Sequence, residues 1–226
     1  SDNNLAQHSS SNFYNLIIDN SSGDVDVTAA LDIDGDLTIA SGADLDIDGS
    51  GVNIELAGSF ANSGTLTISG ETITFDGTGT ETCAAISDAT AILYVSKSSG
   101  SVTTSGNLTL DEIRVTSGSL VVGGETVSVD DQLIVSGGTL QMTSGAINST
   151  GNFELSGGTV DLDGGTFTSD KDDNNDNIIS GGTMDIDGAT VNFGLSTDVL
   201  SDLNMSGGTL DLASGTINIS DELDVS

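Results

Sequence analysis

The sequence predicts an all-β protein, namely a right-handed three-sided parallel β-helix (β-solenoid) with about 20 residues per coil. Three observations predict this fold. A short signature recurs at nearly regular intervals, and segments between its copies alternate apolar with polar residues. The composition contains 30 glycines but no proline and no tryptophan, which suits short strands joined by tight corners.

The recurring signature is Ser-Gly-Gly-Thr followed by an apolar residue. Its copies begin at Ser136, Ser156, Ser180 and Ser206, so the first interval is one basic unit and the later two are lengthened by short insertions. A period of this size is typical of a solenoid, in which each coil stacks on the one before it. An antiparallel sandwich also has short strands at this spacing, but it has no reason to repeat one corner motif.

Each repeat unit contains three short segments with a period of two residues. In the last unit these segments are 209–212, 215–219 and 222–225. Alternation places residues such as Leu210 inside and residues such as Asp211 outside. We therefore expect three strands per coil, each paired with its equivalent in the neighbouring coils. About 11 coils at a spacing of about 4.8 Å predict a rod of roughly 50 Å.

The domain organisation expected from these repeats is a polar leader followed by one continuous solenoid. The predicted boundaries are 1–12 for the leader, 13–226 for the solenoid, 13–88 and 89–135 for a larger block repeat, and 136–226 for the Ser-Gly-Gly-Thr coils. The final run to Ser226 resembles the runs that elsewhere precede Gly-Gly-Thr. Because an uncapped solenoid end exposes strand edges, we expect continuation in a longer chain or a next protomer.

The charge of the chain excludes several classes of partner. Three Lys and Arg residues stand against 35 Asp and Glu residues, giving a formal net charge of −32. Nucleic acids and anionic membranes need clustered cations, whereas Lys97, Arg114 and Lys171 are scattered. No apolar run is long enough to cross a bilayer, so we expect no membrane insertion. The single cysteine, Cys83, cannot form a disulfide within the chain and is interpreted as a small buried apolar residue.

Runs of alternating aspartates are the candidate metal ligands, because Ca²⁺ prefers carboxylate oxygens. The candidates are Asp32, Asp34, Asp36, Asp44, Asp46, Asp48, Asp172, Asp173 and Asp176. The run from Asp44 to Glu55 has the spacing of an EF-hand loop, but the segments on both sides read as strands rather than helices. We therefore predict no EF-hand.

Two interpretations of these aspartates stay open. In the first they are solvated side chains on the outer face of strands. In the second, equivalent positions such as Asp161 and Asp185 stack in ladders, where like charges raise one another's pKa or bind Ca²⁺. The polar insertion at 170–177 is interpreted as a solvated loop, with a cation site or subunit contact as alternatives. No cofactor is required; Ca²⁺ is the one candidate.

Several motifs in the first half resemble a known class of protein. They are Phe13-Tyr14-Asn15-Leu16-Ile17-Ile18, Gly35-Asp36-Leu37-Thr38-Ile39, the run 58–67 and the run 72–80. Together they resemble the repeats of very long secreted bacterial surface proteins of the adhesin-type β-solenoid class. The resemblance covers 13–118 by these motifs and the rest by its Ser-Gly-Gly-Thr coils. It implies a secreted or cell-surface protein of adhesive or scaffolding type, and it carries no catalytic residues.

The expected function is a non-enzymatic extracellular module of a surface filament, stalk or layer. Its expected partner is itself, through end-to-end stacking, with Ca²⁺ as a candidate stabiliser and surface glycans as candidate ligands. One alternative is a glycan-binding adhesin domain. Another is a β-helical polysaccharide-degrading enzyme, by analogy of fold only. A lyase needs cations beside its acids, and a hydrolase needs a deep cleft that short loops do not form, so we predict no catalytic residues.

Overall fold

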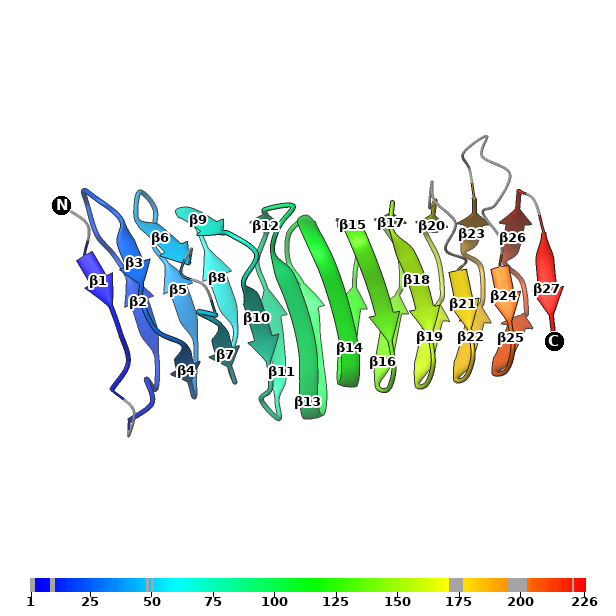
Figure 1. Ribbon diagram of the computed structural model, residues 1–226, viewed down its shortest axis with the longest axis horizontal. Helices are drawn as coiled ribbons and strands as arrows, with labels where there is room; N and C mark the ends of the chain where they lie inside the picture. The colour runs from blue at the N-terminus through cyan, green and yellow to red at the C-terminus, as the bar shows by residue number, and fades with distance from the viewer. Residues whose placement is uncertain are drawn as a thin grey trace.

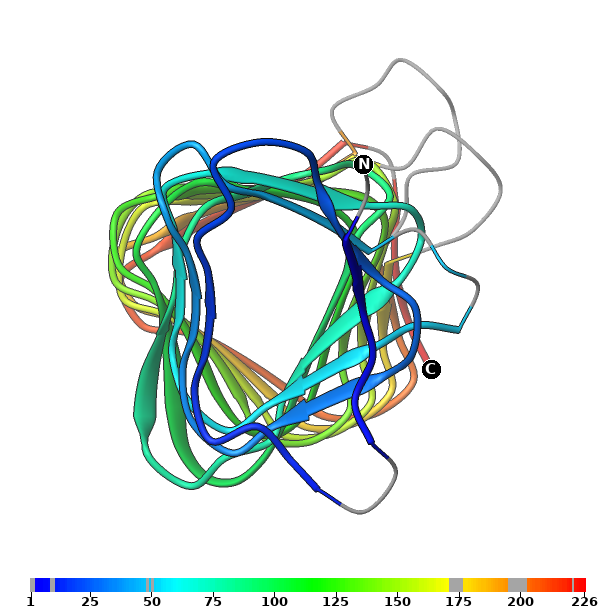
Figure 2. The ribbon, with the colours of Figure 1, turned by 90° about the vertical axis from the view of Figure 1, so that its left-hand side faces the viewer.

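The chain folds into a parallel β-solenoid of about ten turns with about 20 residues per turn (Figure 1). The computed structural model describes residues 3–8, 11–47, 49, 51–170, 177–194, 203–220 and 222–226. Viewed along the rod, the coils superimpose around one interior (Figure 2). The predicted parallel solenoid is confirmed. It has about ten turns rather than the expected 11, because several coils are longer than the basic unit.

The described strands belong to two sheets. The four-stranded sheet contains β1 (Asn3–Leu5), β3 (Val25–Val27), β6 (Asp44–Ile47) and β9 (Thr65–Ile68). The first part of the larger sheet contains β2 (Leu16–Ile18), β4 (Leu31–Ile33), β5 (Leu37–Ile39), β7 (Ile54–Leu56), β8 (Phe60–Asn62), β10 (Thr72–Phe75), β11 (Thr80–Cys83), β12 (Ile86–Ser87), β13 (Ile92–Thr104), β14 (Leu108–Val122) and β15 (Thr126–Val135). The second part contains β16 (Thr139–Met142), β17 (Ala146–Ser149), β18 (Asn152–Leu155), β19 (Thr159–Leu162), β20 (Thr166–Ser169), β21 (Asn177–Ile179), β22 (Thr183–Ile186), β23 (Thr190–Phe193), β24 (Leu203–Met205), β25 (Thr209–Leu212), β26 (Thr216–Ile219) and β27 (Leu223–Val225).

In the second half each strand pairs with the third strand after it. β16, β19, β22 and β25 form one such column, and all their pairings are parallel. Along the column Leu140 lies opposite Val160, which lies opposite Met184. The intervening residues face outward, as the period of two predicted. Each coil in this part therefore contributes three strands and one layer of apolar side chains to the core.

The Ser-Gly-Gly-Thr signature forms a corner at which backbone packs directly on backbone. Gly158 has φ of +71°, a conformation that L side chains rarely adopt. A Cβ atom at this position would lie 2.3 Å from the carbonyl oxygen of Gly138 in the preceding coil. The N–H of Thr159 donates to the same carbonyl oxygen at 2.9 Å. The signature recurs because each coil must leave room for the next at this corner.

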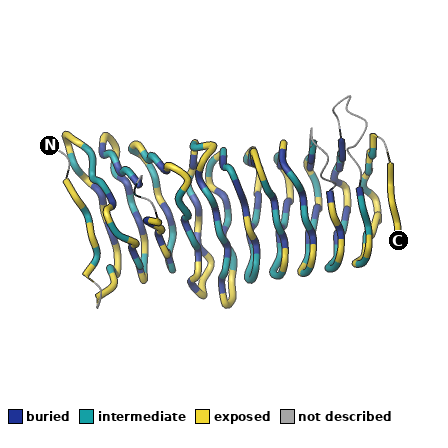
Figure 3. Tube along the Cα trace, viewed as in Figure 1, coloured by how far each residue is buried: buried dark blue, intermediate teal, exposed yellow. Residues whose placement is uncertain are grey.

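The core is a continuous column of buried side chains, mostly Leu, Ile and Val, and buried positions alternate with half-buried ones along many of the strands (Figure 3). Phe153, Phe167 and Phe193 meet in the second half, with the first two rings edge to face and their centroids 5.1 Å apart. Cys83 is fully buried, as predicted, and burial raises the pKa of its thiol to about 12. In the last described coil Val225 is 68% exposed.

Two segments differ from the expected arrangement. Strand β1 lies before the expected start of the solenoid at residue 13, and its Leu5 packs against the core. At the predicted insertion, Asn177 is not part of a solvated loop: it begins β21 and is buried. Its Oδ1 accepts hydrogen bonds from the Ser169 hydroxyl and the Phe153 N–H, which compensate for the burial of this oxygen. Residues 171–176 lie outside the described part of the chain.

Candidate functional site

The predicted calcium ligands that the structure describes lie on different strands and corners. Asp32 lies on β4, whereas Asp44 and Asp46 lie on β6, which belongs to the other sheet. The candidates Asp48, Asp172, Asp173 and Asp176 lie outside the described residues. The EF-hand interpretation stays rejected, because the segments that flank the run are the strands β5 and β7.

Two of the candidates act as acceptors for nearby polar groups. An Asp36 carboxylate oxygen accepts a hydrogen bond from the Ser59 N–H at 2.8 Å, and one from Asp34 accepts from the Asn12 amide at 3.3 Å. Asp side chains commonly stabilise turns in this way. These contacts give both residues a structural role at a corner that needs no ion.

A compact carboxylate cluster does form, and it includes one predicted residue. Asp24, Asp26 and Asp46 each place one carboxylate oxygen so that all three oxygens lie within 4.8 Å of one another. Asp26 and Asp46 are direct neighbours in the parallel register of β3 and β6. All three residues are half-buried. Hard oxygen ligands at this spacing suit Ca²⁺, so the calcium hypothesis now centres on this cluster.

A second row of carboxylates runs along the β19–β22–β25 column. Asp161 lies opposite Asp185, which lies opposite Asp211, as the predicted ladder requires. Burial raises the pKa of Asp161, and the like charges of Asp163 and Asp185 raise it further. The amide of Gln141 donates to Asp161 at 3.2 Å and partly offsets this rise. The ladder neighbour Asp185 therefore contributes to the raised pKa of Asp161, after burial and Asp163.

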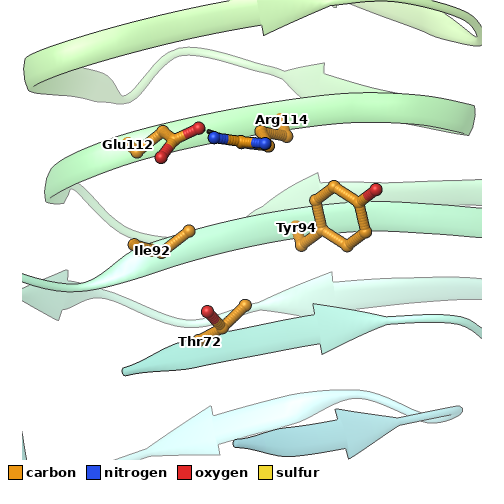
Figure 4. A pocket seen from close by; sticks show the side chains of 5 residues that line it. All are labelled: Thr72, Ile92, Tyr94, Glu112 and Arg114. Atoms are coloured by element: carbon orange, nitrogen blue, oxygen red, sulfur yellow. Dashed lines mark hydrogen bonds and ion pairs between the residues drawn. The ribbon is translucent and has the colours of Figure 1, made fainter. Parts of the chain in front are cut away.

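The outer surface carries a shallow groove of about 220 Å³ between three successive coils. It is lined by Thr72 of β10, Ile92 and Tyr94 of β13, and Glu112 and Arg114 of β14 (Figure 4). Register aligns Thr72 with Ile92 and Ile92 with Glu112, while Tyr94 lies opposite Arg114. The groove therefore combines one aliphatic and one aromatic side chain with the hydroxyl of Thr72 and two charged side chains.

An ion pair orders the polar side of this groove. The Arg114 Nε donates to the Glu112 Oε1, and Figure 4 shows the two side chains next to each other on β14. The Glu112 side chain is 9% exposed and that of Arg114 is 46% exposed. The hydrogen bond to Glu112 raises the pKa of the guanidinium. Among the described residues, Arg114 is the one cationic Lys or Arg side chain on the outer surface, because Lys97 is fully buried.

Sequence reasoning missed an ion pair inside the solenoid. The Lys97 ammonium contacts the Glu81 carboxylate, and both residues are buried. The scattered positions of the cations in the sequence do not reveal this contact. A signal for burial is nevertheless present, since Leu93, Val95 and Lys97 occupy alternate positions of one strand and all face inward.

Comparison with known proteins gives one match. A family model described as "Haemagglutinin repeat" matches residues 20–112 and 95–226, so the two matches together span most of the chain. No curated protein and no solved structure matches the chain. The part of the chain that the structure describes contains no helix of the length and apolarity that crossing a bilayer requires.

Proposed function

The chain belongs to the haemagglutinin-repeat family, and we propose that it is an extended, non-catalytic module of a secreted adhesin-type protein at a cell surface. Its role in this proposal is to hold outward-facing side chains along a stiff rod where another surface can contact them. The family consists of adhesin-type repeats and favours a secreted or surface location. This supports the resemblance seen in the sequence.

The observation that carries the proposal is the stacking of parallel coils over one core in the described part of the chain. About ten turns at about 4.8 Å per turn extend over roughly 50 Å. Each coil exposes its outward side chains at a regular spacing, so the same fold supplies both length and a contact surface. Solenoids use such surfaces to bind extended partners.

The shape of the surface favours adhesion over catalysis. The groove on β10, β13 and β14 is shallow and open, whereas enzymes that cut polysaccharides enclose their substrate in a cleft. Its carboxylate, that of Glu112, is already paired with Arg114. A glycosidase instead uses two carboxyl groups that flank the scissile bond.

Self-association belongs to the same proposal. The corner motif and strand register are common to successive coils of the second half, so any solenoid segment with matching corners is a suitable neighbour. In this arrangement right-handed, three-sided coils of several chains form a filament, stalk or layer. Sedimentation velocity over a wide concentration range tests it: discrete oligomers that grow with concentration are expected, and a strict monomer would contradict it.

Deletion of one coil tests the proposed function. Removing residues 136–155 joins Val135 to Ser156 and preserves the register, because Thr139 and Thr159 occupy equivalent positions. The shortened chain should remain folded and lose about 4.8 Å of length in small-angle X-ray scattering.

The adhesive part of the function needs a second measurement. Beads that carry the chain by one terminus should bind erythrocytes or epithelial cells more than beads that carry an unrelated acidic protein. Beads with the shortened chain should still bind, because the deletion leaves the other coils and their outward side chains in place. Failure of the full-length chain to promote attachment would contradict the adhesive role, and collapse of the shortened chain would contradict independent stacking.

A further inference from the structure

We propose that the groove lined by Thr72, Ile92, Tyr94, Glu112 and Arg114 binds neutral sugar units of a glycan. The proposal rests on the adhesive function proposed above, to which it adds a site and a ligand class. It starts from the groove itself, where an aromatic ring, an aliphatic side chain and an ordered guanidinium lie within one small area of the described surface.

The lining matches the two chemical faces of a pyranose. One face of the sugar carries mainly C–H groups and packs on apolar or aromatic surfaces, which Ile92 and the Tyr94 ring supply. Its rim carries hydroxyl groups, which need donors and acceptors from the protein. The hydroxyls of Thr72 and Tyr94 can do both, and the guanidinium of Arg114 donates. Because the groove is shallow, it suits one or two sugar units of a chain that continues into solvent.

The polar groups are held in place before any ligand binds. The side chains come from three neighbouring strands whose parallel register fixes their spacing. Glu112, with its side chain 9% exposed, holds the Nε of Arg114, whose side chain remains 46% exposed. Glu112 is therefore a positioning residue, and Arg114 offers its outer N–H groups to the ligand.

Charge selects a neutral sugar over an acidic one. Within the groove the charges of Glu112 and Arg114 cancel, and the whole chain carries −32. Next to the groove, burial raises the pKa of Asp111, and the charges of Asp131 and Glu112 raise it further. An approaching sialic, uronic or sulfated sugar meets this crowded negative charge, whereas a neutral sugar does not. A basic peptide finds no unpaired carboxylate in the groove, because that of Glu112 is already bonded to Arg114.

Saturation-transfer NMR with a panel of defined sugars tests the proposal. The probes are lactose, N-acetyllactosamine and N,N′-diacetylchitobiose, compared with sialyllactose, a sulfated disaccharide and an oligolysine peptide. We expect the neutral sugars to bind with a Kd of about 1 mM, as suits an open site with few contacts. Tyr94→Ala should raise this Kd at least about tenfold, and Arg114→Gln should weaken binding, while Tyr94→Phe should retain most of it.

A matched control is available in the first coil. Tyr14 is 76% exposed and lies outside the groove, so Tyr14→Ala should leave sugar binding unchanged. Circular dichroism of each variant separates loss of binding from loss of fold, and Tyr94→Phe serves as the variant that keeps the packing. The proposal is overturned if Tyr94→Ala binds neutral sugars as well as the unaltered chain does. It is also overturned if only acidic sugars or oligolysine bind, or if no sugar binds at about 10 mM.

Failure here is distinguishable from failure of the proposed function. If beads carrying Tyr94→Ala attach to cells as well as the unaltered chain does, the groove is wrong and the adhesive module stands. If the chain binds neutral sugars through Tyr94 but its beads do not attach to cells, the groove stands and the adhesive role is wrong.

Discussion

Replacing Lys97 by methionine should destabilise the middle of the solenoid by about 3–5 kcal/mol. Lys97 has no exposed surface, and the side chain of its partner Glu81 is 9% exposed. Methionine keeps most of the aliphatic stem of lysine, so the change in packing is small. The cost arises because the Glu81 carboxylate stays buried without its counter-ion, and desolvation is then uncompensated.

The same reasoning predicts recovery in a double variant. If Glu81→Leu accompanies Lys97→Met, the buried charge disappears together with its partner, and stability should return to within about 1 kcal/mol of the unaltered chain or exceed it. A substitution at an exposed position of the same corner, Ser98→Met, should change stability by less than about 0.5 kcal/mol. The single variant, the double variant and this control together isolate the electrostatic cost.

Amide hydrogen exchange is the suitable assay, because a solenoid opens locally as well as globally. In Lys97→Met the amides of 80–104 should exchange about a hundredfold to several thousandfold faster, which corresponds to the predicted loss of about 3–5 kcal/mol. Amides in the coils beyond residue 150 should change much less. The reasoning is refuted if the single variant exchanges at the original rate, or if the double variant is no more stable than the single one.

Three other predictions follow from the corners and the carboxylates. Gly158→Ala should lower the free energy of unfolding by about 1–3 kcal/mol in urea titration, because φ is +71° and a Cβ would lie 2.3 Å from the Gly138 carbonyl oxygen of the preceding coil. The control is Gly123→Ala, which should be nearly neutral. Gly123 has an ordinary φ, and a Cβ there would have only a contact at 3.8 Å, to the Glu125 side chain. The raised pKa of Asp161 means that its ionised form opposes folding, so Asp161→Asn should raise Tm at pH 7. This gain should shrink as the pH falls through the folded pKa and vanish below the ordinary value of 3.8; an unchanged difference at acid pH would contradict the assignment. The Tm measured with added Ca²⁺ should exceed the Tm measured with a chelator, and Asp46→Asn should abolish this difference. Equal Tm values with and without Ca²⁺ would contradict a cation site at the cluster of Asp24, Asp26 and Asp46.

The sequence predicted the fold well where the repeat is regular. The four Ser-Gly-Gly-Thr copies set both the period and the corner, and the alternation around residues such as Leu140 set the inward face. The register of the first half was harder to predict, because its coils lack this corner motif. The stacking of Asp26 on Asp46, one coil further along the chain, therefore became visible only in the structure.

The groove and the internal ion pair show why sites are harder to predict than the fold. Tyr94 and Arg114 belong to successive coils and meet only through the parallel register of β13 and β14. Lysine and glutamate are almost never buried unless they are paired. The inward position of Lys97 could be read from its strand, but the identity of its partner, Glu81 in an earlier strand, could not.

The point at which the four-stranded sheet ends has a mechanical consequence. Strand β9 is the last strand of the four-stranded sheet, and Asp88 and Thr90 side chains, rather than a strand, bond the backbone of Ile68. Beside it, β10 and β11 each pair with β13 over four aligned residues. A pull along the rod therefore reaches the next coil through strand pairing at these two columns, but through the side chains of Asp88 and Thr90 at Ile68. Because two side-chain bonds replace a strand ladder there, this corner should separate first when tension loads the interface between these two coils.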